Sequence, residues 1–121
     1  MTQRVLLFET DESLANAIAE GFAKVGASVE VVSDTEAGVN SATGAAPDLV
    51  LLSLDAMSTE GFLVCKKFKS SAALQQVPFV IMGGSEHRGS FESHKKLKRR
   101  KADDYIELPL GVDALIERLG S

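Results

Sequence analysis

The feature that most constrains this chain is a regular alternation of short apolar runs with segments of helical periodicity. Five runs have the length and composition of β-strands: 4–8, 28–32, 48–54, 79–82 and 104–108. A continuous apolar run such as the first is typical of a strand that is buried on both faces. The alternation predicts an α/β fold, in which a doubly wound five-stranded parallel sheet carries helices on both faces.

Five helices are expected between and after these strands. In the first, Leu14, Ile18 and Phe22 lie on one apolar stripe, and Gly26 is expected to end the helix. The expected bounds are 12–25, 35–42, 61–69, 91–101 and 112–119. A loop with three glycines, 83–90, is expected before the fourth helix.

The length of 121 residues suits one domain, and we expect a single domain over 1–121. Hydrophobic residues make up 45% and charged residues 25% of the chain, which is the balance of a soluble globular protein. No apolar run approaches the roughly 20 residues of a membrane helix, and the N-terminus does not have the pattern of a signal peptide. We therefore expect a cytoplasmic location without membrane insertion. The single cysteine, Cys65, lies between Phe62 and Phe68 and is expected to be a buried, inert thiol.

Charge is distributed unevenly along the chain. The net charge is −4, but six of the 13 basic residues fall within 95–101, which leaves 7 basic and 17 acidic residues elsewhere. They are Lys95, Lys96, Lys98, Arg99, Arg100 and Lys101. On the expected helix, with Leu97 facing inward, these like charges repel one another, and folding does not require them. We expect them to bind a partner protein with an acidic surface; the alternative is a solvated face that aids solubility.

In open α/β sheets, ligands bind at the carboxyl ends of the strands, so the residues that follow the strands are candidates for a site. The runs that enter and leave these strand ends are 4–11, 47–55, 77–84 and 102–109. Together they resemble a response-regulator receiver domain (CheY-like) over nearly the whole chain. The resemblance implies a flavodoxin-like sheet with the strand order 2-1-3-4-5 and, in typical members, an aspartate that a histidine kinase phosphorylates.

The resemblance also implies five chemical parts, of which this chain retains one. A typical receiver has two acidic residues after the first strand for Mg²⁺, the acceptor aspartate after the third, a hydroxyl after the fourth and a lysine after the fifth. The matching positions here are Glu9 and Thr10, Ser53, Gly83 and Leu108. A serine hydroxyl cannot form an acyl phosphate, and Glu9 has no carboxylate neighbour. We expect no catalytic activity, no cofactor and no resident metal.

One carboxylate keeps a phosphoacceptor alternative open. Asp55 lies two residues beyond Ser53 with the same strand parity, so it could point toward the same edge of the sheet. The other interpretation is a turn aspartate that caps nearby amides. Because an unpartnered buried charge is costly, the combined loss of the acceptor and its charged neighbours favours a stable, phosphorylation-independent module.

Within the receiver family, the chain resembles the pseudo-receiver domains of gliding-motility proteins. The similar stretches are 61–69, 77–83, 94–98 and 102–105, although those domains keep the lysine that Leu108 replaces here. The resemblance implies that the fourth helix, fifth strand and fifth helix form the output surface. It includes Tyr105, which we expect to be half-buried in a fixed orientation. The partner is expected to be another signalling or motility protein.

Two further features give weaker hypotheses. Nucleic acid could contact the basic helix, but the domain is acidic and has no interleaved aromatic residues for base stacking, so we do not expect this partner. His87 and His94 do not have a spacing typical of a metal site, and both are expected to be surface histidines.

Overall fold

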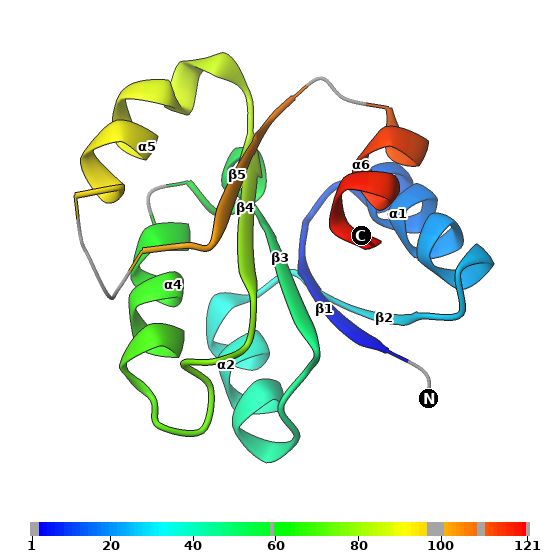
Figure 1. Cartoon of the computed structure of the whole chain (residues 1–121), viewed down its shortest axis with the longest axis horizontal. Coiled ribbons are helices and arrows are strands. Elements are labelled where there is room, and N and C mark those ends of the chain that lie inside the picture. Colours follow the sequence, from blue (N-terminus) through cyan, green and yellow to red (C-terminus); the bar gives the residue numbers. More distant parts are fainter. Residues whose placement is uncertain (1–2, 59, 97–100, 109–110, 121) are drawn as a thin grey trace.

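The computed structural model describes residues 3–58, 60–96, 101–108 and 111–120 (Figure 1). Its centre is a parallel sheet with the strand order β2-β1-β3-β4-β5, as predicted. The strands are β1 (Arg4–Phe8), β2 (Ser28–Val32), β3 (Leu49–Ser53), β4 (Phe79–Gly83) and β5 (Asp104–Glu107). In each pairing the strands run in the same direction, so all their carboxyl ends lie at one edge.

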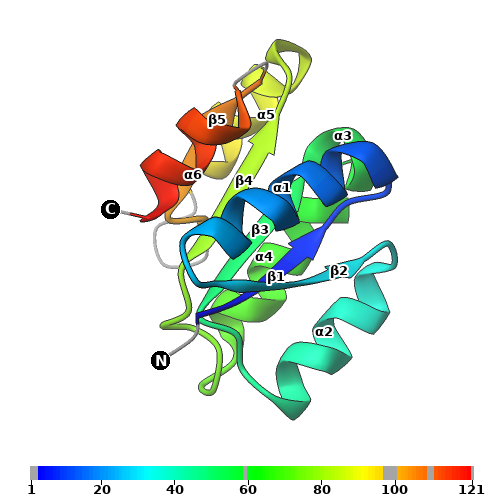
Figure 2. The same ribbon diagram turned by 90° about the vertical axis from the view of Figure 1, so that its right-hand side faces the viewer.

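Helices cover both faces of the sheet (Figures 1 and 2). One face carries α1 (Glu12–Lys24) and α6 (Val112–Gly120), which pack on each other. The other face carries α2 (Thr35–Gly44), α4 (Glu60–Ser70) and α5 (Arg88–His94). A short helix, α3 (Leu54–Met57), follows β3, and a single 3₁₀ turn, η1 (Ser85–His87), follows β4.

The strands have this arrangement because successive side chains alternate between two buried clusters. Leu6 and Phe8 pack with the helices α2, α4 and α5, whereas Val5 and Leu7 pack with α1 and α6. Every residue of β3 and β4 is buried. The continuous apolar runs of the sequence therefore correspond to central strands covered on both sides.

Local hydrogen bonds begin the first two helices where the sequence predicts. The Asp11 side chain accepts from the Leu14 N–H at 3.1 Å and caps α1. The Asp34 side chain accepts from the Ala37 N–H at 2.9 Å and caps α2. Each cap satisfies an N–H group that has no partner within its helix.

Most predicted elements differ from the structure by one or two residues at an end, and two of the differences bear on the site. The third strand was predicted over 48–54, but it ends at Ser53, and Leu54 begins α3. The fourth long helix was predicted over 91–101 after a loop at 83–90. Instead, η1 and the first turn of α5 occupy 85–90, and α5 ends at His94. Lys95 and Lys96 lie in the turn that follows α5, so the prediction of one basic helix is wrong for these residues.

Cys65 is fully buried in α4, as predicted. Burial raises the pKa of its thiol to about 12, which keeps it protonated and unreactive at neutral pH. In the described part of the chain, no helix combines the length and the apolar character needed to cross a membrane.

Candidate functional site

The carboxyl edge of the sheet brings the sequence-predicted site residues together. Glu9 directly follows β1, Ser53 ends β3, Gly83 ends β4 and Leu108 directly follows β5. Ser53 is in register with Met82, and Gly83 is in register with Glu107. The Leu108 N–H donates to the Gly83 carbonyl at 2.8 Å. We call these four residues, with Thr10, the carboxyl edge.

Glu9 is buried, but its carboxylate is turned toward the backbone that leads into α1. Its Oε2 accepts from the N–H groups of Thr10 at 2.9 Å and Asp11 at 3.1 Å. Its Oε1 is buried without a hydrogen-bond partner. Thr10 itself is exposed. Oε2 of Glu9 therefore fixes the turn into α1, and Oε1 has no hydrogen-bond partner.

Ser53 serves as the N-cap of α3. Its side chain is 1% exposed, and its Oγ accepts from the Ala56 N–H at 3.4 Å. The backbone of Ser53 is extended, as is typical of an N-cap. The side chain at the acceptor position thus lies inside the protein and is part of a local turn.

Gly83 is buried, with little space around its Cα. A Cβ at this position would lie 3.0 Å from Cδ2 of His87 and 3.2 Å from Cβ of Leu54. A threonine or serine here would require its neighbours to move. The imidazole of His87 occupies space that a side chain at residue 83 would need.

Leu108 stands where a typical receiver has its lysine. It is half-buried and packs against the apolar cluster of the α1 and α6 face. Its side chain contributes apolar area to the core and no positive charge to the carboxyl edge.

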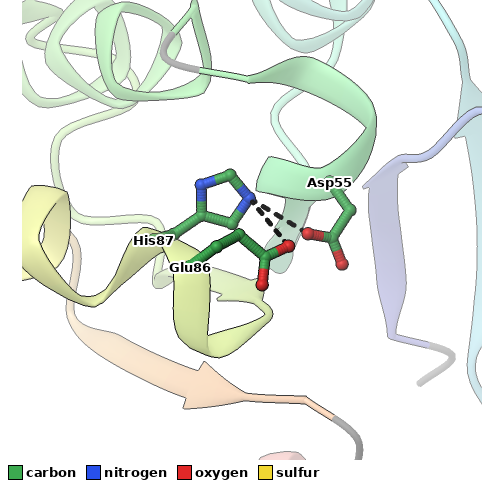
Figure 3. A group of neighbouring side chains, drawn as sticks. All are labelled: Asp55, Glu86 and His87. Carbon is green, nitrogen blue, oxygen red and sulfur yellow. Dashed lines mark hydrogen bonds and ion pairs between the residues drawn. The ribbon is translucent and has the colours of Figure 1, made fainter.

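Asp55 lies in α3, beyond the end of β3. The argument from strand parity is therefore wrong, because the period of two ends at Ser53. Its Oδ1 accepts from the Gly84 N–H at 3.4 Å and lies 3.0 Å from Nε2 of His87 (Figure 3). The contact with Gly84 agrees with the interpretation of an aspartate that caps a nearby amide. The expectation that His87 is a plain surface histidine is wrong: its side chain is 20% exposed and is paired with Asp55.

His94 is also not a surface residue, contrary to expectation. It is 4% exposed, and its Nε2 accepts from the Ala102 N–H at 2.9 Å. Its Nδ1 is buried without a partner. Burial lowers the pKa of His94, so the ring is neutral with its proton on Nδ1. This hydrogen bond joins the end of α5 to Ala102, two residues before β5, across the basic segment, 95–101.

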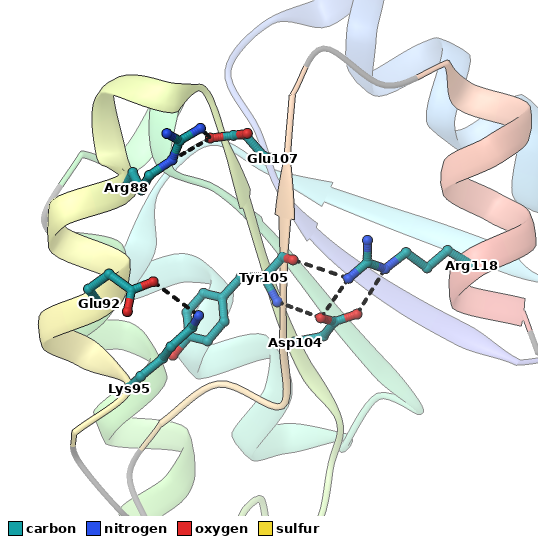
Figure 4. A network of polar contacts seen from close by, with 7 residues as sticks. All are labelled: Arg88, Glu92, Lys95, Asp104, Tyr105, Glu107 and Arg118. Atoms are coloured by element: carbon teal, nitrogen blue, oxygen red, sulfur yellow. Dashed lines mark hydrogen bonds and ion pairs between the residues drawn. The ribbon is translucent and has the colours of Figure 1, made fainter.

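Tyr105 on β5 packs beside this histidine. Its ring centroid lies 5.0 Å from that of Phe91 and 5.7 Å from that of His94. The ring is half-buried, and its hydroxyl is buried without a partner. Burial raises the pKa of Tyr105, so the hydroxyl stays protonated. The Lys95 Nζ lies 5.5 Å from the ring centroid, within cation–π range (Figure 4).

The face formed by α5, β5 and α6 carries exposed charges, several of them paired (Figure 4). Arg88 pairs with Glu107 at 2.7 Å, and Arg118 pairs with Asp104 at 2.9 Å. Of the predicted basic residues, Lys95, Lys96 and Lys101 are exposed. Lys98, Arg99 and Arg100, together with the predicted inward residue Leu97, lie outside the described residues. We call this surface the α5–β5–α6 face.

The fold and the sequence both match bacterial signalling proteins. In structure, the chain is similar to the chemotaxis response regulator CheY4 of Vibrio cholerae, with a TM-score of 0.86, 16% identity and coverage of 99% of this chain and 98% of that one. It is also similar to a signal receiver domain from Bermanella marisrubri, with a TM-score of 0.80, 21% identity and coverage of 99% and 97%. The chain has the fold of a response-regulator receiver domain.

Sequence comparison extends this similarity to full-length regulators. The transcriptional regulatory protein QseB of Haemophilus influenzae is 29% identical over 116 residues, which are 96% of this chain and 50% of that protein. The sensory transduction protein BceR of Halalkalibacterium halodurans is 25% identical over 96% of this chain and 48% of its own length. The chain therefore spans about half the length of the curated relatives it matches. No family model matches the chain.

Proposed function

We propose that this receiver domain signals without phosphorylation, by binding a partner protein through the α5–β5–α6 face. The main evidence that the domain signals without phosphorylation is the position of Ser53 at the end of β3. Its side chain is 1% exposed and is the N-cap of α3. A hydroxyl in this position cannot form the acyl phosphate on which a typical receiver depends.

The neighbouring residues support the same proposal. A magnesium ion prefers several oxygen ligands, most of them carboxylates and waters, in near-octahedral geometry. At the carboxyl edge, Glu9 Oε2 is engaged by two backbone N–H groups, and Thr10 supplies no carboxylate. These residues do not fit the magnesium site of a typical receiver, although Glu9 Oε1 is unpartnered.

The two groups that would hold a phosphoryl oxygen are absent as well. Leu108 packs into the core in place of a lysine, and the space beside Gly83 is taken by His87. A buried charge without its partner is costly, so the loss of all of these groups together favours one stable state. We infer that the protein does not depend on a phosphorylation switch.

The second half of the proposal concerns the partner. Lys95, Lys96 and Lys101 are exposed at the two ends of the basic segment, and the bond from His94 to Ala102 holds these ends together. These three lysines form a local positive surface on a domain whose net charge is −4. Complementary charge speeds encounter and sets specificity, so the partner we propose is a signalling or motility protein with an acidic surface.

One observation favours a second candidate function. The side chain of Asp55 is 45% exposed and lies just beyond β3, within reach of a small phosphodonor. Against this role, Oδ1 is held by Gly84 and His87, and no lysine or hydroxyl of the typical kind stands beside it. An atypical acceptor at Asp55 is the alternative that a phosphorylation assay must exclude.

The partner-binding proposal is tested by neutralising three lysines on the proposed surface and, in a control, three lysines elsewhere on the domain. The test variant is Lys95→Gln with Lys96→Gln and Lys101→Gln; the control is Lys24→Gln with Lys66→Gln and Lys67→Gln, which are exposed on α1 and α4. A partner captured from native cells with the wild-type chain is purified, and association rates are measured over a range of salt concentrations.

We expect the test variant to associate more slowly and with a weaker salt dependence, while the control behaves more like the wild type. Equal behaviour of the two variants would move the interface away from the basic segment. If the wild-type chain binds DNA in the same assay and the test variant does not, a nucleic-acid partner is favoured instead.

A further inference from the structure

Three side chains with metal-binding atoms meet beside the carboxyl edge. Asp55 comes from α3, and Glu86 and His87 come from η1, about 30 residues further along the chain. One ligand atom from each lies within 4.8 Å of the other two (Figure 3). Among the described residues, this is the group of His, Cys, Asp and Glu side chains that meets this criterion.

The spacing of the donor atoms is that of a small transition-metal site. His87 Nε2 lies 3.0 Å from Asp55 Oδ1 and 3.8 Å from Glu86 Oε1. Metal–ligand distances of about 2.0–2.1 Å in a tetrahedral zinc site place ligand atoms about 3.3 Å apart. These two separations lie on either side of this value, and the ligand atoms of Asp55 and Glu86 lie within 4.8 Å of each other, so side-chain adjustments would bring all three atoms to one ion.

The charges of the group favour binding of a dication. Asp55 and Glu86 carry two negative charges, and both are paired with the same histidine. A neutral imidazole cannot balance them. Within the described residues, no lysine or arginine forms an ion pair with either carboxylate. A divalent cation would offset the repulsion between the carboxylates and would use the imidazole nitrogen as a ligand.

Gly83 provides an independent reason for the position of the imidazole. Because residue 83 has no side chain, the His87 ring can lie against the end of β4, where a Cβ would be 3.0 Å from Cδ2. The backbone of η1 is also held, since the His87 N–H donates to the Gly84 carbonyl at 3.1 Å. Asp55 is fixed from the other side by the Gly84 N–H. The ligands are therefore partly organised before any ion binds.

We propose that Asp55, Glu86 and His87 form a binding site for a first-row transition-metal dication, with Zn²⁺ as the reference ion. An imidazole with two carboxylates suits zinc and its neighbours better than magnesium, which prefers oxygen ligands alone. On binding, the ion takes the place of the Nε2 proton that faces Oδ1; this proton passes to water, and the neutral imidazole takes up its one proton on Nδ1 instead. Water or a partner side chain completes the coordination. The ion links α3 to η1, from which α5 and the α5–β5–α6 face continue.

The test is calorimetric titration of the full, tag-free chain with ZnCl₂ and, separately, with MgCl₂. We expect one zinc ion per chain with a dissociation constant in the micromolar range, and much weaker binding of magnesium. Asp55→Asn and His87→Ala should each weaken zinc binding at least about tenfold, since the loss of even an outer-shell partner has an effect of that size. Glu36→Gln, an exposed carboxylate on α2, is the matched control and should bind as the wild type.

The two histidines of the chain provide a second readout that does not depend on the variants. In NMR spectra of the wild-type protein, zinc should shift the ring resonances of His87 and leave those of His94 in place. Saturable binding with these shifts supports the site. Absence of saturable binding, unchanged affinity in folded Asp55→Asn, or displacement of zinc by equal magnesium would each overturn it. The titration uses unphosphorylated protein, so these outcomes do not depend on whether Asp55 can accept a phosphoryl group.

Discussion

The carboxyl edge and the α5–β5–α6 face both derive from receiver architecture, but they use their polar groups in opposite ways. At the carboxyl edge, Glu9 and Ser53 are buried and engaged with nearby backbone, and the half-buried Leu108 packs against the core. On the α5–β5–α6 face, Arg88, Lys95 and Arg118 are exposed and form ion pairs with carboxylates at the surface. At the edge these polar groups take part in local structure, whereas on the face they are exposed and paired at the surface.

The largest effect is expected when charge is returned to the edge. Ser53→Asp should lower the free energy of unfolding by about 3–5 kcal/mol, because the carboxylate would be buried without a cation. Its pKa would be raised in the folded state, so the loss should be greatest at neutral pH and should shrink as the pH falls toward about 4. Ser53→Asn, which has the same shape and no charge, is the control. Urea unfolding that shows equal stability for the two variants at every pH would mean that the position is hydrated.

A smaller loss is expected when the missing hydroxyl is returned. Gly83→Thr should destabilise the domain by about 1–3 kcal/mol, because its Cβ would meet His87 and Leu54. The same substitution in a His87→Ala background should cost less, and a double-mutant cycle measures the difference. Gly89→Thr is the matched control, since a Cβ there has nothing within 4 Å. If the cycle shows no coupling, His87 is not what closes this space.

The next largest loss of stability is expected when the hydrogen bond between His94 and Ala102 is removed. His94→Phe leaves the Ala102 N–H without its acceptor and should cost about 1–2 kcal/mol at pH 7.5. Because burial lowers the pKa of His94, the unfolded chain binds a proton more readily than the folded one, and wild-type stability should fall as the pH drops below 6.5. The gap between wild type and variant should therefore narrow toward pH 5. A gap of constant size would show that His94 does not titrate in this way.

The smallest effect is expected on the exposed face itself. Arg88 and Glu107 are 67% and 45% exposed, so their ion pair should contribute about 0.5 kcal/mol or less. Arg88→Gln, Glu107→Gln and the double variant, compared by thermal unfolding, give the coupling. A coupling above about 1 kcal/mol would mean that this face stabilises the fold and is not simply available for a partner.

The sheet could be predicted from sequence because its central strands, β3 and β4, are buried on both faces. The runs 5–8, 49–52 and 79–82 are each apolar throughout, which is typical of strands covered on both sides. The boundary at Ser53 could not be found in the same way. Leu54 is buried in a helix as fully as it would be in a strand, so hydrophobicity does not show where β3 ends.

The end of α5 was missed for a related reason. The predicted loop contained Gly83, Gly84 and Gly89, but Gly89 lies within α5. Because glycine is typical of loops, this residue led to a helix start that was predicted too late. The long basic run then suggested a helix that continued to Lys101. The contact that replaces it, from His94 to Ala102, spans the basic segment and leaves no local pattern in the sequence.

Some residues of the candidate site could be predicted from the sequence, and others could not. Glu9, Ser53, Gly83 and Leu108 could be located because each is fixed by its position after a strand. The meeting of Asp55 with Glu86 and His87 could not, because it depends on the turn of α3 and on the space left open at Gly83. Pairs separated by about 30 residues appear only once the chain is folded.

The most direct test of the account is the mass of the intact protein after incubation with acetyl phosphate and magnesium. A receiver domain with a complete acceptor pocket serves as the positive control, and Asp55→Asn identifies any adduct at the alternative position. The account predicts that the wild-type chain gains no phosphoryl mass under conditions in which the control is modified. A labile phosphoryl adduct that disappears in Asp55→Asn would contradict it and would show that this chain can accept a phosphoryl group on an aspartate.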